Sequence, residues 1–336
     1  MSSRQLLRRS IMASKTTAAT APAVNDLTVV FGDQAVIAPL KAPKAPQQTI
    51  TMFAGATAGQ WVPAIDPKYV WSKELLRLAQ RLVSQVVSKN WLLVGPPGCG
   101  KTEFAYQLCA RTNRPVEVVE CSEAIEADAL FSTILPAEDT KSGLKRIDGP
   151  VVRAARSGAT LILDEVTGLA PEVQIALHNL LDGRPIQIRA TGEIVTPHKE
   201  FMVIATANDV SGEHRHKYKG TFALNSAFKS RFAAPKFSYL DEATEIAALI
   251  SRAPGLDPII ARSLVRVAIA VRTSVAAQLR EFSFRELMVA GRALATQKSM
   301  KVEDAVLEAY SGKETSQDAS AIGDLVKAEL ALSKAK

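Results

Sequence analysis

The stretch "WLLVGPPGCGKTEFAYQL", residues 91–108, places a glycine-rich turn between a strand-like apolar run and a helix-like run. It matches the pattern G-x-x-x-x-G-K-[ST], which needs a strand before it and a helix after it. In such a loop the glycines let backbone N–H groups curl around a β-phosphate, and the following helix presents its positive end. We therefore expect a nucleotide site along the whole loop: Gly95, Pro96, Pro97, Gly98, Cys99, Gly100, Lys101 and Thr102.

The end of the loop and a later acidic pair indicate ATP bound together with Mg²⁺. Lys101 is placed to reach the β- and γ-phosphate oxygens, and the Thr102 hydroxyl to bind the metal ion. The run "TLILDE", residues 160–165, ends a buried strand in Asp164 and Glu165. We interpret Asp164 as a second metal ligand and Glu165 as the catalytic base or the residue that positions water. Taken alone, the pair is more typical of an acidic turn that ends a strand.

A third polar residue follows another buried strand. The run "FMVIATAN", residues 201–208, ends in Asn208. Ligands in parallel α/β sheets lie at the carboxyl ends of the strands, so this amide is expected beside Glu165. There it could hold the attacking water or sense the γ-phosphate. The alternative is an asparagine that caps a turn.

The order of elements predicts an α/β fold followed by helices. Four apolar runs alternate with helical patterns, which favours a parallel sheet covered on both faces. An amphipathic helix is expected at residues 71–89, and after Lys236 only helical periodicity remains. The predicted divisions are a basic, Ala- and Pro-rich tail at 1–48, the nucleotide-binding core at 49–236, a helical lid at 237–312 and a tail or short helix at 313–336.

Composition limits the possible classes of function. Of the net charge of +7, residues 1–50 supply +4, from six basic and two acidic residues, so the remainder is only weakly basic. The three cysteines lack metal-ligand spacing, which favours a reducing compartment. No run of eighteen apolar residues occurs. Residues 1–20 have the composition of a transit peptide but no apolar face, which favours a disordered tail and a cytoplasmic protein.

The order of glycine loop, "LILDE", "ATAN", "SRF" and "SFREL" resembles the AAA+ ATPases, and within them the MoxR branch. The runs "VPAIDPKYVW" at 62–71 and "YKGTFALNSAFKSRF" at 218–232 are similar to the AAA+ subunit of aerobic cobaltochelatase and its relatives. The resemblance implies a P-loop αβα core with a five-stranded parallel sheet and a small all-α lid. It also implies a homo-oligomeric ring, usually a hexamer, with ATP at each subunit boundary.

The resemblance assigns three further roles. Asn208 is sensor 1, Arg231 is the arginine finger that acts in trans on the neighbour's ATP, and Arg285 is sensor 2. From the residues alone, Arg231 also fits a helix cap or a solvated face, and Arg285 fits a surface salt bridge. Insertions typical of the branch are expected at 134–150 and, as a hairpin, at 185–197. Both also fit solvated loops.

Two functions of different classes remain open at this stage. The first is a ring ATPase that remodels, activates or assembles a protein partner, such as a cofactor protein with a metal-dependent adhesion domain. The second is a motor on DNA or RNA, which would use the basic amino-terminal tail and the basic run at residues 214–236. Its phenylalanines are spaced more like packing residues than like base-stacking platforms. A ring that binds nucleotide without hydrolysis is disfavoured because every hydrolytic position is filled.

Overall fold

In this computed structural model the described residues are 24–26, 30, 49–53, 60–137, 143–208, 222–273, 280–310 and 316–334. Residues 214–221 of the basic run at 214–236 fall outside these ranges. Near the amino terminus, β1 (Val24–Asp26) pairs with β2 (Thr49–Thr51) in antiparallel register. Every helix of the described residues is too short or too polar to cross a membrane.

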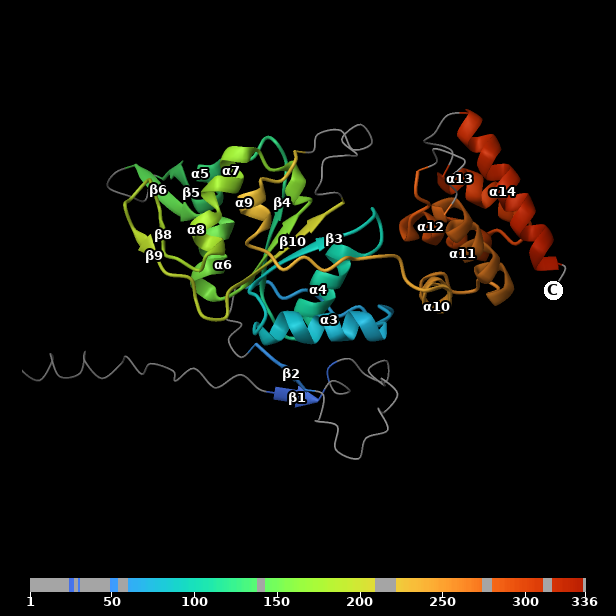
Figure 1. The fold of residues 1–336 in the computed structure, drawn as a ribbon, viewed down its shortest axis with the longest axis horizontal. Helices are drawn as coiled ribbons and strands as arrows, with labels where there is room; N and C mark the ends of the chain where they lie inside the picture. The colour runs from blue at the N-terminus through green and yellow to red at the C-terminus, as the bar shows by residue number, and fades with distance from the viewer. Residues whose placement is uncertain are drawn as a thin grey trace, which may run out of the picture.

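The core is a parallel sheet with helices on both faces (Figure 1). Its strands are β3 (Asn90–Val94), β4 (Val116–Glu120), β7 (Thr160–Asp164) and β10 (Met202–Ala207). They lie in the order β3, β10, β7, β4, and all three pairings are parallel. The sheet therefore brings the carboxyl ends of β3, β7 and β10 to a single edge.

The predicted fold class is confirmed, but a fifth full strand is not formed by the described residues. The segment after Phe232 runs parallel to β3 and joins it only through isolated bridges at Ala233 and Lys236. Pro235 lies between these two positions and has no N–H to donate to the neighbouring strand. The expected fifth strand is thus reduced to two bridges at the outer side of β3.

Side chains of the strands alternate between the two faces of the sheet. Trp91 and Leu93 of β3 pack with α3 (Lys73–Ser84) and α4 (Lys101–Arg111), whereas Leu92 faces the other layer. That layer includes α6 (Pro150–Ser157), α7 (Pro171–Ala176) and α8 (His178–Leu181). Both faces are covered, so β3, β7 and β10 are almost entirely buried, as expected for a parallel sheet, whereas the edge strand β4 carries Glu117 and the exposed Glu120.

The first predicted helix is shorter than its periodicity indicated. The helix was expected to reach residue 89, but α3 ends at Ser84. Gln85 adopts a left-handed conformation with φ 53° and its side chain donates to the Glu200 carbonyl oxygen at 3.1 Å. The chain therefore turns toward β3, and Val86 is left 85% exposed.

The carboxyl-terminal part is entirely helical in the described residues. Its helices are α10 (Glu242–Arg252), α11 (Pro258–Thr273), α12 (Phe284–Thr296), α13 (Val302–Tyr310) and α14 (Ser316–Lys334). They share a separate hydrophobic core, to which α14 contributes the buried Ile322 and Val326. Ser283 and Glu286 form a capping box that fixes the start of α12.

Two hairpins extend from the core. The short helix α5 (Ala127–Phe131) leads into β5 (Ser132–Pro136), which pairs with β6 (Leu144–Asp148) in antiparallel register. The polar stretch expected at 134–150 is therefore largely a β-hairpin. The predicted hairpin at 185–197 is confirmed, with β8 (Ile186–Gln187) paired to β9 (Ile194–Val195).

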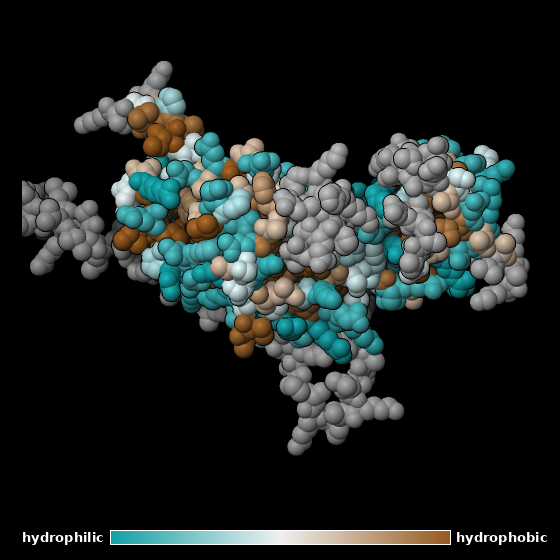
Figure 2. Space-filling model, turned by 45° about the horizontal axis from the view of Figure 1, so that its top comes forward, coloured by the Kyte–Doolittle hydropathy of each residue, from teal (hydrophilic) through white to brown (hydrophobic). Residues whose placement is uncertain are grey.

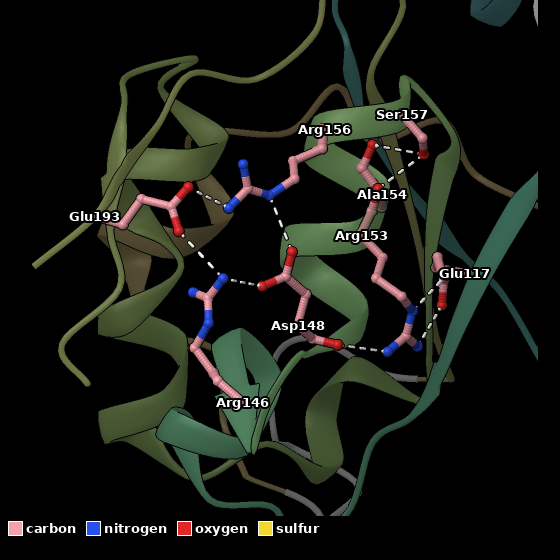
Figure 3. Close-up of polar contacts among 8 residues, drawn as sticks. All are labelled: Glu117, Arg146, Asp148, Arg153, Ala154, Arg156, Ser157 and Glu193. Atoms are coloured by element: carbon pink, nitrogen blue, oxygen red, sulfur yellow. Dashed lines mark hydrogen bonds and ion pairs between the residues drawn. The ribbon is translucent and has the colours of Figure 1, made fainter. Parts of the chain in front are cut away.

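Four charged side chains tie these hairpins to each other and to α6 (Figure 3). Arg156 donates to Asp148 at 3.0 Å and to Glu193 at 2.6 Å, and Arg146 pairs with the same two carboxylates at 2.9 and 3.1 Å. Arg153 forms a bidentate pair with Glu117 of β4 and also donates to the Asp148 carbonyl oxygen at 2.7 Å. The two arginines and the two carboxylates thus alternate in a closed circuit of ion pairs that links both hairpins.

Replacing Arg156 with alanine is expected to loosen both hairpins without unfolding the core. The side chain is 39% exposed, so we expect a loss of only about 0.5 to 1 kcal/mol in the free energy of unfolding. Hydrogen exchange should accelerate in residues 144–148 and 186–195, and about 1 M salt should reduce the difference from the parent protein. Arg189→Ala is the control, since its pair with Asp128 is long at 3.7 Å and highly exposed. Unchanged exchange in both hairpins would contradict the assignment.

Candidate functional site

The glycine loop joins β3 to α4 at the carboxyl edge of the sheet. Gly98 and Gly100 have φ values of 67° and 96°, in the left-handed region where glycine carries no steric penalty. Gly100 is the N-cap of α4, and no side chain caps the first turn of this helix. The N–H groups of this first turn are therefore available to an anion rather than bound to a capping side chain, which is the geometry of an anion site.

Lys101 is held in place by oxygen atoms from both sides of the loop. Its Nζ donates to the carbonyl oxygens of Gly95 and Pro96, each at 2.8 Å, and to Asn208 Oδ1 at 2.9 Å. The residue is only 7% exposed, and burial lowers the pKa of its ammonium group. The structure thus brings together two predicted site residues, Lys101 and Asn208. The Lys101 ammonium group is thus held by uncharged oxygen acceptors, which a phosphate oxygen of a bound nucleotide can replace.

A hydroxyl and a carboxylate meet where a metal ion was predicted. The Thr102 hydroxyl donates to Asp164 Oδ1 at 2.7 Å, and the Thr206 hydroxyl donates to the same oxygen at 2.5 Å. Mg²⁺ binds hard oxygen ligands and is usually held by one or two carboxylates together with substrate phosphates. The donor set of Thr102 and Asp164 therefore fits Mg²⁺. Thr206 was not identified from the sequence, because a threonine within an apolar strand looks like an ordinary strand residue.

Glu165 is presented by an uncommon backbone conformation. Its φ is 54°, in the left-handed region that a non-glycine residue seldom adopts. The Glu165 N–H donates to the Thr206 hydroxyl at 3.0 Å, which fixes the turn after β7 to the neighbouring strand β10. The side chain is exposed and lines the same cleft as Lys101. The backbone turn thus directs a carboxylate into the cleft beside the buried cation.

The cleft lies between the core and the helical part and has a volume of about 480 Å³, which suits a small-molecule ligand. The cleft is also lined by Arg285 of α12, by Arg252 of α10 and by Tyr69, which lies before α3. Tyr239 joins the two parts, because its hydroxyl donates to the Pro97 carbonyl oxygen at 2.8 Å. A Cβ added at Gly98 would lie 2.6 Å from Ser283 Cβ, so the loop also touches the start of α12.

A buried ion pair supports the helical wall of the cleft. Glu245 is 1% exposed and accepts two hydrogen bonds from Arg272, both at 2.8 Å. Burial raises the pKa of Glu245, and the hydrogen bonds from Arg272 act in the opposite direction. The Arg272 guanidinium also lies 3.6 Å from the centre of the Tyr239 ring, which is a cation–π contact. The sequence offered no local signal for this set, because its members lie on separate helices and a connecting segment.

Arg231 is the one predicted catalytic residue that does not line this cleft. Its Nε and Nη2 atoms donate to the two carboxylate oxygens of Asp182, at 2.8 and 3.2 Å. Residues 97–102 of the loop, Asp164, Glu165, Asn208 and Arg285 therefore line one cleft. Gly95 and Pro96 do not line it and instead accept hydrogen bonds from Lys101, and Arg231 lies elsewhere on the chain. The His214–Gly220 part of the basic run, on which the nucleic-acid hypothesis drew, lies outside the described residues.

The cysteines are buried thiols. Cys99 lies in the glycine loop at 9% exposure, and burial raises its pKa. Burial likewise raises the pKa of Cys109 to about 11 and that of Cys121 to about 12. All three are free thiols. Because the reactive form is the thiolate, none is suited to nucleophilic chemistry at neutral pH.

Residues 90–232 match the family model of the AAA domain, dynein-related subfamily. The protein NorQ of Paracoccus denitrificans is 33% identical over 217 residues, which cover 64% of this chain and 76% of NorQ. The uncharacterized protein SH1500 of Staphylococcus haemolyticus is 37% identical over 158 residues, covering 46% of this chain and 57% of SH1500. The chain thus matches little more than half the length of that relative. A crystal structure of NtrX from Brucella abortus with ADP, 17% identical, superposes with a TM-score of 0.45 over 68% of this chain and 50% of that chain.

Proposed function

Since the chain belongs to the MoxR-type AAA+ ATPases of the dynein-related subfamily, we propose that it forms a homo-oligomeric ring, in which hydrolysis of MgATP remodels, activates or assembles a protein partner. The observation that carries the proposal is the convergence of Lys101, Asp164, Glu165 and Asn208 on one cleft beside the glycine loop. These side chains match the groups that phosphoryl transfer to water requires.

The proposed reaction uses the side chains as they are placed around the cleft. The loop N–H groups and Lys101 bind the β- and γ-phosphates, and Asn208 and Glu165 orient a water molecule in line with the γ-phosphorus. A bond forms from the water oxygen to phosphorus as the bond to the β–γ bridging oxygen breaks. The water proton passes to Glu165, and the products are ADP and phosphate. Bound Mg²⁺, held by Thr102 and Asp164, supplies charge neutralisation.

The position of Arg231 supports assembly of subunits. No arginine of the αβα core that the structure describes, Arg231 included, lines the cleft. We assign Arg231 to the ATP of the neighbouring subunit, which makes hydrolysis depend on ring formation. In the same proposal Arg285 contacts the γ-phosphate from the lid of its own subunit.

The surface of the β5–β6 hairpin favours a protein as the partner. Ile134, Leu135, Leu144 and Ile147 are 42–53% exposed. The register places Ile134 and Leu144 on one face of the hairpin and Leu135 and Ile147 on the other, so both faces carry exposed apolar side chains. Figure 2 shows hydrophobic side chains at this end of the core, away from the helical part. Exposed apolar side chains on a projecting hairpin favour contact with a protein, whereas a nucleic-acid surface is dominated by basic side chains.

ATP turnover is expected to depend on Mg²⁺ and on protein concentration. Chelation with EDTA should reduce phosphate release to background, and added Mg²⁺ should restore it. Thr102→Ala should raise the Mg²⁺ concentration for half-maximal turnover by at least about tenfold, because it removes one predicted ligand. Thr273→Ala, at an exposed threonine of α11, is the control. Mass photometry with ATP would measure the assembly on which turnover should depend.

Full turnover in EDTA would contradict the assignment of Thr102 and Asp164 to the metal ion. Turnover per subunit that is independent of protein concentration, in a sample that remains monomeric, would contradict the proposal of a ring.

A further inference from the structure

Arg231 is held by two partners that leave part of its guanidinium available. Its Nε and Nη2 atoms donate to Asp182 Oδ1 and Oδ2, and its Nη1 atom donates to the Ala227 carbonyl oxygen. A guanidinium has five N–H donors, so these contacts use three of them. In the part of the chain that the structure describes, these contacts leave one N–H on Nη1 and one on Nη2 without an acceptor. Two such donors are suited to bind a phosphate in a bidentate manner.

The backbone of Arg231 and that of the Asp182 segment share one buried anchor. Asn90 begins β3 and is 8% exposed. Its Nδ2 donates to the Leu181 carbonyl oxygen at 2.7 Å and to the Arg231 carbonyl oxygen at 3.1 Å. Leu181 is the residue directly before Asp182. One side-chain amide therefore fixes the distance between the carboxylate and the arginine that it binds.

Aromatic packing holds the two segments together as well. Phe228 of α9 (Ser226–Lys229) is fully buried and stacks on His178 of α8, with ring centres 6.3 Å apart. Phe232, which follows Arg231 directly in the sequence, packs on Phe228 with ring centres 5.1 Å apart. Arg231 thus extends from a segment whose flanking residues are anchored in the core, which limits the freedom of its backbone.

The electrostatic surroundings keep the pair charged. The hydrogen bond from Arg231 lowers the pKa of Asp182 below its ordinary value, so the carboxylate is ionised at neutral pH. Burial lowers the pKa of the neighbouring His178, and the positive charge of Arg231 lowers it further. His178 is therefore neutral at pH 7 and does not compete with Arg231 for the carboxylate.

We propose that Asp182 is a positioning residue: it binds one edge of the Arg231 guanidinium so that the remaining N–H pair faces the γ-phosphate of the neighbouring subunit's ATP. The inference rests on the proposed action of Arg231 in trans. An arginine side chain loses rotamer freedom when it is ordered, and the bidentate pair with Asp182 imposes that order before the subunits meet. Asp182 then contributes to the rate without touching the nucleotide.

The test is Asp182→Asn, which preserves the size of the side chain but removes its charge and one acceptor. We expect kcat to fall by about 10- to 100-fold, because a small misplacement of a catalytic group has an effect of this order. The KM for ATP and the assembly state should not change, since the variant's own cleft is intact. Asp182→Glu keeps the carboxylate and should retain more activity than Asp182→Asn. Asp257→Asn is a matched control at an exposed aspartate near the start of α11.

Mixed assemblies separate positioning from a structural role. Asp182→Asn subunits keep Glu165, and Glu165→Gln subunits keep both Asp182 and Arg231. Turnover should therefore recover when the two inactive variants are mixed, at sites where a Glu165→Gln subunit supplies the arginine. No recovery on mixing would overturn the inference, as would parental kcat in Asp182→Asn together with an inactive Arg231→Ala. Parental turnover in Arg231→Ala would instead refute the trans role itself.

Discussion

Arg231→Ala is expected to reduce ATP turnover by about 10³- to 10⁵-fold, the contribution that arginine fingers make in other phosphoryl-transfer enzymes. Nucleotide affinity should stay close to that of the parent protein, because Arg231 does not line the cleft of its own subunit. The two effects are measured separately, by phosphate release at saturating ATP and by titration with a fluorescent ATP analogue. A large loss of turnover with unchanged nucleotide affinity identifies an interaction that is made only in the transition state.

The control for this variant is Arg266→Ala, which removes an arginine that pairs with Glu242 on the surface of the helical part. It should leave turnover unchanged, since surface ion pairs contribute little. Mixing Arg231→Ala with Glu165→Gln subunits should restore part of the activity, because some sites then combine an intact Glu165 with a neighbour's intact Arg231. Turnover of Arg231→Ala equal to that of the parent protein would remove Arg231 from the catalytic site.

Glu165→Gln is expected to reduce turnover by about 10²- to 10⁴-fold, the range that a positioned general base contributes. The amide keeps the size of the side chain and the unusual turn after β7, so ATP and Mg²⁺ should still bind. The variant should therefore accumulate in the ATP-bound state. Affinity purification with ATP, followed by mass spectrometry, would then identify any protein that the proposed ring binds in its ATP-bound state.

The matched control is Glu172→Gln, at an exposed glutamate of α7. It should turn over ATP at the parental rate and retain no more of the partner than the parent protein does. If Glu165→Gln hydrolyses ATP normally, Glu165 is not the base. If the variant is inactive but holds the same proteins with ADP as with ATP, the proposed coupling of ATP to the partner is wrong.

The parts of the site that could be predicted are those that depend on local sequence and on sheet topology. The strand, loop and helix around Lys101 are contiguous, and buried strands that end in Asp164 or Asn208 must meet at one edge of a parallel sheet. The observed hydrogen bonds from Thr102 to Asp164 and from Lys101 to Asn208 follow from these two facts. Their chemical roles stay predictions.

Contacts between distant segments could not be predicted in this way. The Asp182–Arg231 pair spans 49 residues, and the Tyr239–Pro97 hydrogen bond spans 142. Neither contact has a characteristic sequence spacing by which it could be recognised, because each depends on how the layers of the fold pack together. The left-handed turn at Gln85 was missed for a related reason: a glutamine inside a helical pattern gives no sign that tertiary contacts will end the helix there.

One error could have been avoided from the sequence alone. The fifth strand was expected from the resemblance, yet Pro235 lies where that strand would need to donate a hydrogen bond. A proline at this position limits pairing to the residues around it, which is what the bridges at Ala233 and Lys236 show. At this edge of the sheet, the missing N–H of Pro235 therefore had more influence than the five-stranded pattern implied by the resemblance.

The buried thiols make the protein well suited to site-specific labelling. All three cysteines of the chain are enclosed, and their raised pKa values disfavour reaction with maleimides at neutral pH. A cysteine introduced at Ile194, which is 68% exposed on the β8–β9 hairpin, would therefore react well ahead of the native thiols. One fluorophore could be placed on each chain without removing any natural cysteine, and energy transfer between labelled chains would then report whether the proposed ring assembles and changes shape during turnover.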